Sequence, residues 1–165
     1  MKLVVLVRHG KAEHTDEPKP DFRRDLTTRG EVDATVVAEE IKPMLPEHLS
    51  FISSPANRAL QTAVFFAAVL GYPEHSIREE EDLYDGLTTN EFLSILAKTP
   101  DESNCVLVFG HNPTQTILAD RMLEHFNRIL PTSGAVAIRF AVQSWSDIEP
   151  RSGELAFYKY PKMFR

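Results

Sequence analysis

LVVLVRHG, residues 3–10, is the stretch of sequence that indicates the fold. Its five apolar residues, three of them β-branched valines, run without a breaker into a polar Arg-His-Gly. Such a run is typical of a β-strand, because branched side chains pack well on a pleated surface. We therefore predict a first strand from Leu3 to Val7 that ends where the polar residues begin.

The same pattern recurs along the chain, and helical patterns lie between the first four strands. Four more strands are predicted where β-branched and large apolar residues run between breakers: Leu49 to Ser53, Val106 to Phe109, Ala135 to Phe140 and Glu154 to Tyr158. Four helices are predicted from apolar periodicity and caps: one from Arg29 to just before Pro43, one from Asn57 to Leu70 with Gly71 as its C-cap, one that begins with the capping-box pair Thr88 and Glu91, and one from the N-cap Asn112 through Leu123.

Alternating strands and helices favour a three-layer α/β/α fold with a mainly parallel sheet, because parallel neighbours need a crossover that a helix supplies. The last two predicted strands follow each other without a clear helix, so we expect one antiparallel edge strand. A chain of 165 residues is long enough for one well-buried core, and we expect a single domain over residues 1–165. Segments 11–25 and 143–153 are predicted as surface loops, the first of them mobile.

The composition argues against several classes of function. The formal net charge of −6 at pH 7 opposes non-specific binding to nucleic acid or to an anionic membrane. No stretch approaches the roughly 20 apolar residues of a membrane span, and the apolar start is too short for a secretory signal, so we expect a cytoplasmic protein. The one cysteine, Cys105, cannot form an internal disulfide, and we expect it to be a buried, inert thiol.

Basic and imidazole side chains follow three of the predicted strands. Arg8 and His9 come directly after the first strand, Arg58 follows the second in the run SSPANR, and His111 follows the strand that begins at Val106. Taken singly, such residues are often surface ion pairs or packed histidines. In open α/β sheets, however, ligands bind beyond the carboxyl ends of the strands. We therefore expect the four side chains to converge on one edge of the sheet.

This set of side chains suits a phosphoryl group. Arginine offers a permanently charged, planar fork that matches two phosphate oxygens. Phosphoryl transfer needs positioning and charge stabilisation at the equatorial oxygens, which Arg8, Arg58 and His111 could supply without a metal. His9 could attack phosphorus in line if its far ring nitrogen is held by a hydrogen bond. Gly10 would let the backbone approach the phosphate, and its amide is a candidate anchor for His9.

The chain resembles the histidine phosphatase superfamily in three motifs: RHG at 8–10, SSPANRALQTA at 53–63 and GHNP at 110–113. Within that superfamily it resembles the SixA-type phosphohistidine phosphatases in LTTRG at 26–30, in PTSGAVAI at 131–138 and in its short length. The matches extend from Leu3 to about Ile138. The resemblance implies a phosphoglycerate mutase-like fold.

The resemblance also implies roles for individual residues. His9 would be the nucleophile that becomes phosphorylated, and Asn112 would cap the adjoining helix. The implied phosphate-binding and rim residues are Arg8, Gly10, Arg58, His111, Ser133 and Gly134, with Thr132 beside the last two.

The proton donor is left open by the sequence. Many superfamily members carry an acid in a segment that resembles LYDGLTTNEF, residues 83–92, and Asp85 is the residue expected there. Glu81 and Asp82 are alternatives, and SixA-type proteins do not reliably keep this acid. The nitrogen leaving group of phosphohistidine can already be protonated near neutral pH, so it needs less acid assistance than an alkoxide.

No metal or cofactor is expected, because the sequence contains no HExxH, HxH, paired-cysteine or nucleotide-binding glycine motif. The chain has little material for a lid, so we expect an open pocket that admits a phosphorylated side chain of another protein. The expected function is that of a metal-independent phosphohistidine phosphatase acting on a phosphotransfer or signalling protein. Two alternatives stay open: a phosphomonoesterase for a small sugar phosphate or nucleotide, with Asp85 as its acid, and a non-catalytic module that binds phosphoproteins.

Overall fold

Six β-strands form one sheet in the computed structural model, which describes residues 1–14 and 19–165. The strands are β1 (Lys2–Arg8), β2 (Leu49–Ser53), β3 (Arg78–Glu79), β4 (Cys105–Gly110), β5 (Ala135–Phe140) and β6 (Glu154–Lys159), and they pair in the order β3-β2-β4-β1-β5-β6. The first four strands are parallel to one another, whereas β5 runs antiparallel to both of its neighbours, β1 and β6. The predicted mainly parallel sheet with an antiparallel edge is confirmed.

Strand β1 lies inside the sheet, and both of its faces are covered. Leu3, Val5 and Val7 belong to one hydrophobic cluster, whereas Val4 and Leu6 belong to the other. Each of these five side chains is at most 7% exposed. Burying one such side chain stabilises a fold by about 1.5–3 kcal/mol. The apolar run at residues 3–7 therefore supplies a substantial part of the driving force for forming both halves of the core.

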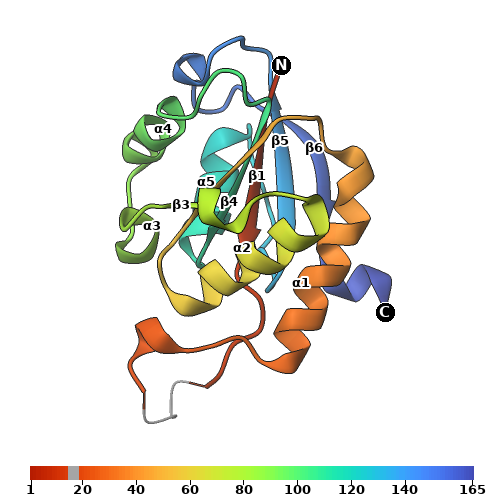
Figure 1. Ribbon diagram of the computed structural model, residues 1–165. Coiled ribbons are helices and arrows are strands. Elements are labelled where there is room, and N and C mark those ends of the chain that lie inside the picture. Colours follow the sequence, from red (N-terminus) through yellow and green to blue (C-terminus); the bar gives the residue numbers. More distant parts are fainter. Residues whose placement is uncertain (15–18) are drawn as a thin grey trace.

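Helices cover both faces of the sheet (Figure 1). Helices α1 (Thr28–Ile41) and α2 (Asn57–Leu70) pack with the cluster that contains Val5, and they lie in front of the sheet in the figure. Helices α4 (Thr89–Ala97) and α5 (Thr114–Met122) contribute to the other cluster, and a short α3 (Asp82–Asp85) precedes α4. The three-layer arrangement agrees with the prediction. Within the described ranges 1–14 and 19–165, no helix is long and apolar enough to cross a membrane.

The element boundaries follow the sequence signals closely. The bounds of β2, β5 and α2 agree with the prediction. Strands β1 and β4 are one residue longer than predicted at each end, and β6 is one residue longer at its C-terminal end. The capping box is present, since the Thr88 hydroxyl accepts from the Glu91 N–H at 3.1 Å and the Glu91 carboxylate accepts from the Thr88 N–H at 2.8 Å. The sequence missed β3 and α3 because two and four residues are too few for an apolar pattern to repeat.

The predicted capping role of Asn112 is wrong. Helix α5 begins at Thr114, and its N-cap position makes no side-chain cap hydrogen bond. The Asn112 amide instead donates to the carbonyl oxygen of Leu130 at 2.8 Å, and its side-chain oxygen accepts from the Thr116 hydroxyl at 3.0 Å. Asn112 therefore ties the start of α5 to the segment before β5, which is a long-range contact that a local pattern does not reveal.

The first turn of α1 packs against the backbone that follows His9. The carbonyl oxygen of Lys11 accepts hydrogen bonds from the backbone N–H of Thr27 at 2.9 Å and from its hydroxyl at 3.2 Å. The same hydroxyl oxygen caps α1 by accepting from the Gly30 N–H at 3.1 Å. A Cβ atom at Gly30 would overlap the Lys11 carbonyl group. Glycine at this position therefore allows α1 to lie directly against the loop after β1.

We predict that Gly30→Ala lowers the free energy of unfolding by about 1–3 kcal/mol, because the added methyl group forces the Lys11 backbone away from α1. Urea denaturation measures the change. The matched control is Glu39→Ala on the exposed side of the same helix, with an expected change within about 0.5 kcal/mol. A gain in stability for Gly30→Ala, as is usual for a free helical glycine, would contradict the close approach.

Candidate active site

The structure brings together the four side chains that the sequence places at three strand ends. Arg8 is the last residue of β1 and His9 follows it, while His111 follows β4. Arg58 lies in the first turn of α2, just beyond β2. The rings of His9 and His111 are 5.2 Å apart between centroids. Both arginines are close enough for their charges to act on both imidazoles.

The ring of His9 is fixed by its neighbour. Its Nδ1 lies 2.7 Å from the carbonyl oxygen of Gly10. A carbonyl oxygen can only accept, so Nδ1 carries the proton and donates it, and Nε2 keeps its lone pair. The expected anchor, the Gly10 amide N–H, is therefore wrong, because Nδ1 contacts the carbonyl oxygen of this residue. The Gly10 N–H donates instead to the Thr62 hydroxyl oxygen at 2.9 Å, and that hydroxyl donates to the carbonyl oxygen of Arg58 at 2.7 Å.

Both imidazoles are held in the neutral form. Burial lowers the pKa of His9 to about 3, and the charges of Arg58 and Arg8 act in the same direction against the hydrogen bond to Gly10. Burial lowers the pKa of His111 to about 4, again with a contribution from Arg58. At neutral pH the lone pair of the His9 imidazole is therefore available for bonding.

Ser54 contacts His111 and was not singled out from the sequence. Its hydroxyl oxygen lies 2.8 Å from Nε2 of His111 and accepts a hydrogen bond from the Ala56 N–H at 3.2 Å. On the other side, the ring of Tyr84 from α3 packs edge-on against the His111 ring, with centroids 5.5 Å apart. The motif SSPANR contained a signal for Ser54, because it follows a strand directly. Tyr84 had none, since α3 was not recognised.

Arg58 is already engaged by an acidic residue that the sequence did not indicate. Its guanidinium donates from Nη1 to the backbone carbonyl oxygen of Asp21 at 2.8 Å and from Nη2 to the Asp21 carboxylate at 3.1 Å. The Tyr84 hydroxyl donates to the same carboxylate oxygen at 2.9 Å. Asp21 lies in the segment predicted as a mobile surface loop, of which residues 15–18 lie outside the described residues. Its acidic, proline-rich surroundings carry no periodic signal.

The residues expected at the pocket rim hold the backbone of the site. The Ser133 N–H donates to the carbonyl oxygens of Arg8 at 3.0 Å and His9 at 3.1 Å, and the Arg8 N–H donates to the carbonyl oxygen of Gly134 at 3.1 Å. The Arg8 guanidinium donates to the carbonyl oxygen of Leu130 at 3.1 Å, and burial lowers its pKa. Ser133 and Gly134 thus lie against Arg8 and His9 through their backbone atoms.

The candidate acids lie at the outer side of this cluster. Asp85 is exposed at the end of α3, next to Tyr84, and Glu81 and Asp82 are exposed at its start. Glu13 lies close to His9 in the sequence, but its carboxylate forms an ion pair with the Lys19 ammonium group at 2.7 Å.

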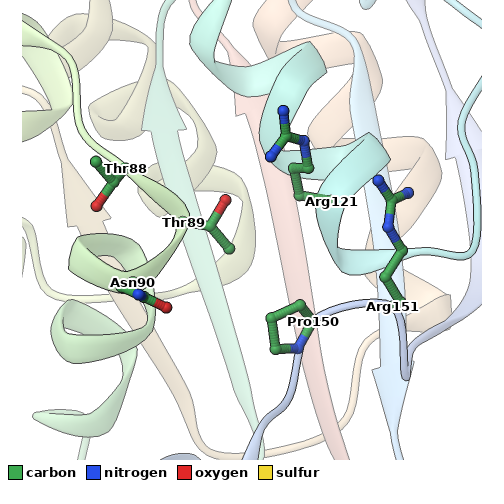
Figure 2. A pocket seen from close by; sticks show the side chains of 6 residues that line it. All are labelled: Thr88, Thr89, Asn90, Arg121, Pro150 and Arg151. Atoms are coloured by element: carbon green, nitrogen blue, oxygen red, sulfur yellow. The ribbon is translucent and has the colours of Figure 1, made fainter.

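A separate hollow of about 380 Å³ has neither His9 nor His111 in its lining. It is lined by Thr88, Thr89, Asn90, Arg121, Pro150 and Arg151 (Figure 2). The Arg151 guanidinium donates to the backbone carbonyl oxygens of Asp120 at 2.6 Å and Glu124 at 2.8 Å, so it closes the end of α5. Among the residues that the structure describes, no histidine or cysteine side chain lines this hollow. In the described part of the chain, no three histidine, cysteine or acidic side chains gather closely enough to hold a metal ion.

Known proteins share this chain's sequence pattern and fold. The family model of the histidine phosphatase superfamily (branch 1) matches residues 4–102. An uncharacterised chloroplastic protein of Arabidopsis thaliana is 29% identical over 162 residues, which cover 92% of this chain and 72% of that protein. The protein histidine phosphatase SixA in complex with tungstate superposes with a TM-score of 0.82 at 23% identity, over 99% of each chain. A protein of Nakamurella multipartita, assigned as a phosphohistidine phosphatase SixA, superposes with a TM-score of 0.80 at 24% identity, over 97% of this chain and 96% of its own.

The matched residues 4–102 make up more than half of the chain and include Arg8, His9 and Arg58. The two solved structures extend the shared fold over nearly the whole chain, including the region of His111. The resemblance stated from the sequence motifs is confirmed at the level of the superfamily, and the SixA-type fold is confirmed with it. The chain belongs to the histidine phosphatase superfamily.

Proposed function

We propose that this protein is a SixA-like protein phosphohistidine phosphatase in which His9 is the nucleophile. The observation that carries the proposal is the state of His9: its Nδ1–H is held by the Gly10 carbonyl, so Nε2 keeps a lone pair beside two arginines and a second imidazole. Membership of the superfamily supports a phosphate-bearing substrate. The phosphoprotein partner, the single domain over 1–165, the cytoplasmic location and the absence of nucleic-acid or membrane binding stay predictions.

In the first step, Nε2 of His9 attacks the phosphorus atom of a phosphohistidine on the partner protein. A new N–P bond forms to His9, and the bond from phosphorus to the partner's imidazole breaks with its electron pair passing to that nitrogen. The partner's other ring nitrogen already carries a proton, so a neutral imidazole leaves. The ring of phosphorylated His9 then carries positive charge, which the Gly10 carbonyl oxygen stabilises by accepting from Nδ1.

In the second step, a water molecule attacks the phosphorus atom on His9. Its hydroxyl group bonds to phosphorus, its remaining proton passes to a phosphate oxygen, and the N–P electron pair returns to Nε2. Arg8, Arg58 and His111 stabilise the charge on the equatorial oxygens in both steps. The role of these three residues follows from their position around His9 and is part of the proposal.

A protein substrate suits the shape of the chain near the site. The connection from α2 to α4 contains only the short elements β3 and α3 and a turn of 3-10 helix at Glu74–Ser76. A substrate as large as a phosphorylated domain needs an open approach, and a small metabolite is usually enclosed by a larger lid. Hydrolysis of a small phosphate ester, with Asp85 as acid, is the competing function that the experiments below separate.

We expect purified protein, with a chelator present, to hydrolyse phosphohistidine on a phosphotransfer domain faster than aryl or sugar phosphate esters. His9→Ala should lower that rate at least about a thousandfold, because it removes the attacking nitrogen. His75→Ala, which removes an exposed histidine from a short turn, is the matched control and should keep the wild-type rate. Release of inorganic phosphate measures both. Binding of the phosphodomain without any turnover would instead support the non-catalytic module.

The proton donor is tested with Asp85→Asn. If Asp85 protonates an ester oxygen, we expect the variant to lose about a hundredfold in hydrolysis of an alkyl phosphate and far less with phosphohistidine, whose leaving group brings its own proton. Glu81→Gln and Asp82→Asn are made in parallel as the rival acids of the same segment. Equal rates for all three variants with the alkyl ester would show that none of these carboxyl groups is the donor.

The low pKa values of His9 and His111 predict a pH-dependent stability. An unfolded imidazole has a pKa near 6.5, whereas the folded values are about 3 and about 4, so the unfolded chain binds more protons at acidic pH. The free energy of unfolding should be highest above pH 6.5 and should fall as the pH drops from 6.5 towards 4. Each of the two histidines contributes a fall of up to about 1.4 kcal/mol for each pH unit.

Urea denaturation between pH 7 and 4.5 measures this slope. His111→Asn should reduce it, because one of the two neutral buried imidazoles is gone. An unchanged slope in His111→Asn would mean that His111 titrates as an ordinary exposed histidine.

A further inference from the structure

The guanidinium of Arg58 meets a carboxylate at the position where the proposed function requires a phosphate. Both terminal nitrogens of Arg58 donate to Asp21, one to its carboxylate and one to its backbone carbonyl oxygen. The Arg58 side chain is 8% exposed, and its Nε makes no hydrogen bond within residues 1–14 and 19–165. A phosphoryl group that binds the terminal nitrogens of Arg58 therefore has to take the place of Asp21.

Asp21 is held next to Arg58 but is not locked there. The Arg24 guanidinium donates to its Oδ1 at 2.9 Å, and the Tyr84 hydroxyl donates to its Oδ2 at 2.9 Å. The Asp21 side chain is 47% exposed, so water can reach it. A carboxylate that moves off Arg58 can therefore keep Arg24, Tyr84 or water as partners, and the exchange leaves no buried charge unpaired.

The segment that carries Asp21 is attached to α2 by other contacts. The Asp25 carboxylate accepts from the side-chain amides of Asn57 at 3.0 Å and Gln61 at 2.8 Å, and the Leu26 N–H donates to Gln61 at 2.8 Å. Figure 1 shows this segment, between β1 and α1, beyond the end of the sheet to which the arrow of β1 points. Because these contacts hold the segment without Arg58, Asp21 is not needed simply to anchor it.

We propose that Asp21 binds Arg58 in the empty site, competes with the phosphoryl group for Arg58, and returns to Arg58 to help expel inorganic phosphate. We call this competing side chain of Asp21 the carboxylate clasp. The inference rests on the proposed function, since it assumes that Arg58 binds the phosphoryl group. The clasp makes Asp21 a specificity residue. A monoanion, such as a sulfate monoester or a carboxylate, brings no more negative charge to Arg58 than the Asp21 carboxylate that it displaces. A phosphoryl dianion brings more negative charge and therefore competes better for Arg58.

The position of Asp21 favours a clasp over a proton donor. Burial alone would raise its pKa, but hydrogen bonds from Arg24 and Tyr84, together with the charge of Arg58, lower it to about 2. At neutral pH the carboxyl group therefore carries no proton to donate. Asp21 contacts Arg58 and Tyr84, and the ring of Tyr84 packs against the ring of His111. Asp21 thus lies on the Arg58 and His111 side of the pocket.

The test is Asp21→Asn, which keeps the size of the side chain and removes its charge. We expect inorganic phosphate and tungstate to bind about threefold to tenfold more tightly than to the wild type, and KM for the phosphorylated substrate to fall by a similar factor. Titration calorimetry measures the affinities, and steady-state kinetics separates KM from kcat. Thermal unfolding establishes that each variant is folded.

Glu39→Gln is the matched control. It removes one carboxylate charge from an exposed position of α1 and leaves the contacts of Arg58, Asp21 and Asp25 in place. Phosphate affinity within about twofold of the wild type in this variant, together with tighter binding in Asp21→Asn, supports the clasp and excludes a general effect of lost negative charge.

Three results would overturn the proposal, and they differ from one another. Unchanged phosphate affinity in Asp21→Asn, in a wild type that binds phosphate and requires His9 for turnover, removes the clasp and leaves the proposed function standing. A fall in kcat with alkyl esters at unchanged affinity would make Asp21 the proton donor instead. If neither the wild type nor Asp21→Asn binds phosphate or tungstate, the phosphoryl site and the clasp are both wrong.

Discussion

The structure depends on placing two arginines and two imidazoles together at the end of a buried sheet. Positive charges that share a partly desolvated space repel one another, so the site is stable only if some groups stay neutral and the others find acceptors. His9 and His111 stay neutral, with pKa values of about 3 and about 4. Arg8 donates to a backbone carbonyl group, and Arg58 donates to Asp21. The same repulsion makes the pocket receptive to an anion.

The backbone of the RHG motif is held by several elements at once. The His9 N–H donates to the carbonyl oxygen of Gly110 at the end of β4, and the Gly10 N–H donates to Thr62 on α2. The Ser133 N–H, just before β5, donates to two carbonyl oxygens of the motif. Each partner reaches this place only when the sheet and α2 have assembled. The geometry of the site is therefore a property of the packed core, and preorganisation of this kind lowers the cost of reaching a transition state.

Much of this could be predicted from local patterns, and the exceptions share a cause. The five predicted strands have long apolar runs, whereas the two-residue β3 has none. Arg8, His9, Arg58 and His111 could be predicted because each lies at or directly after a strand end or at the start of a helix. Asp21 contacts Arg58 from a loop, whereas Tyr84 and Ser54 contact His111 from a single helical turn and a strand end. For Asp21 and Tyr84 no periodic pattern predicts the contact, and Asn112 was misassigned because its partner, Leu130, is distant in sequence.

The sequence by itself determined the layered α/β architecture and the identity of the groups that carry charge or a nucleophilic nitrogen, because apolar periodicity and the order of strands act locally along the chain. Only the tertiary structure decided which atoms of those groups are free. The proton on Nδ1 of His9 is assigned by the Gly10 carbonyl group, the neutral state of both imidazoles comes from burial, and the partner of Arg58 comes from a loop that begins after β1. Tautomers, pKa values and occupied donors depend on distances between segments far apart in sequence, and those distances exist only after the chain has packed.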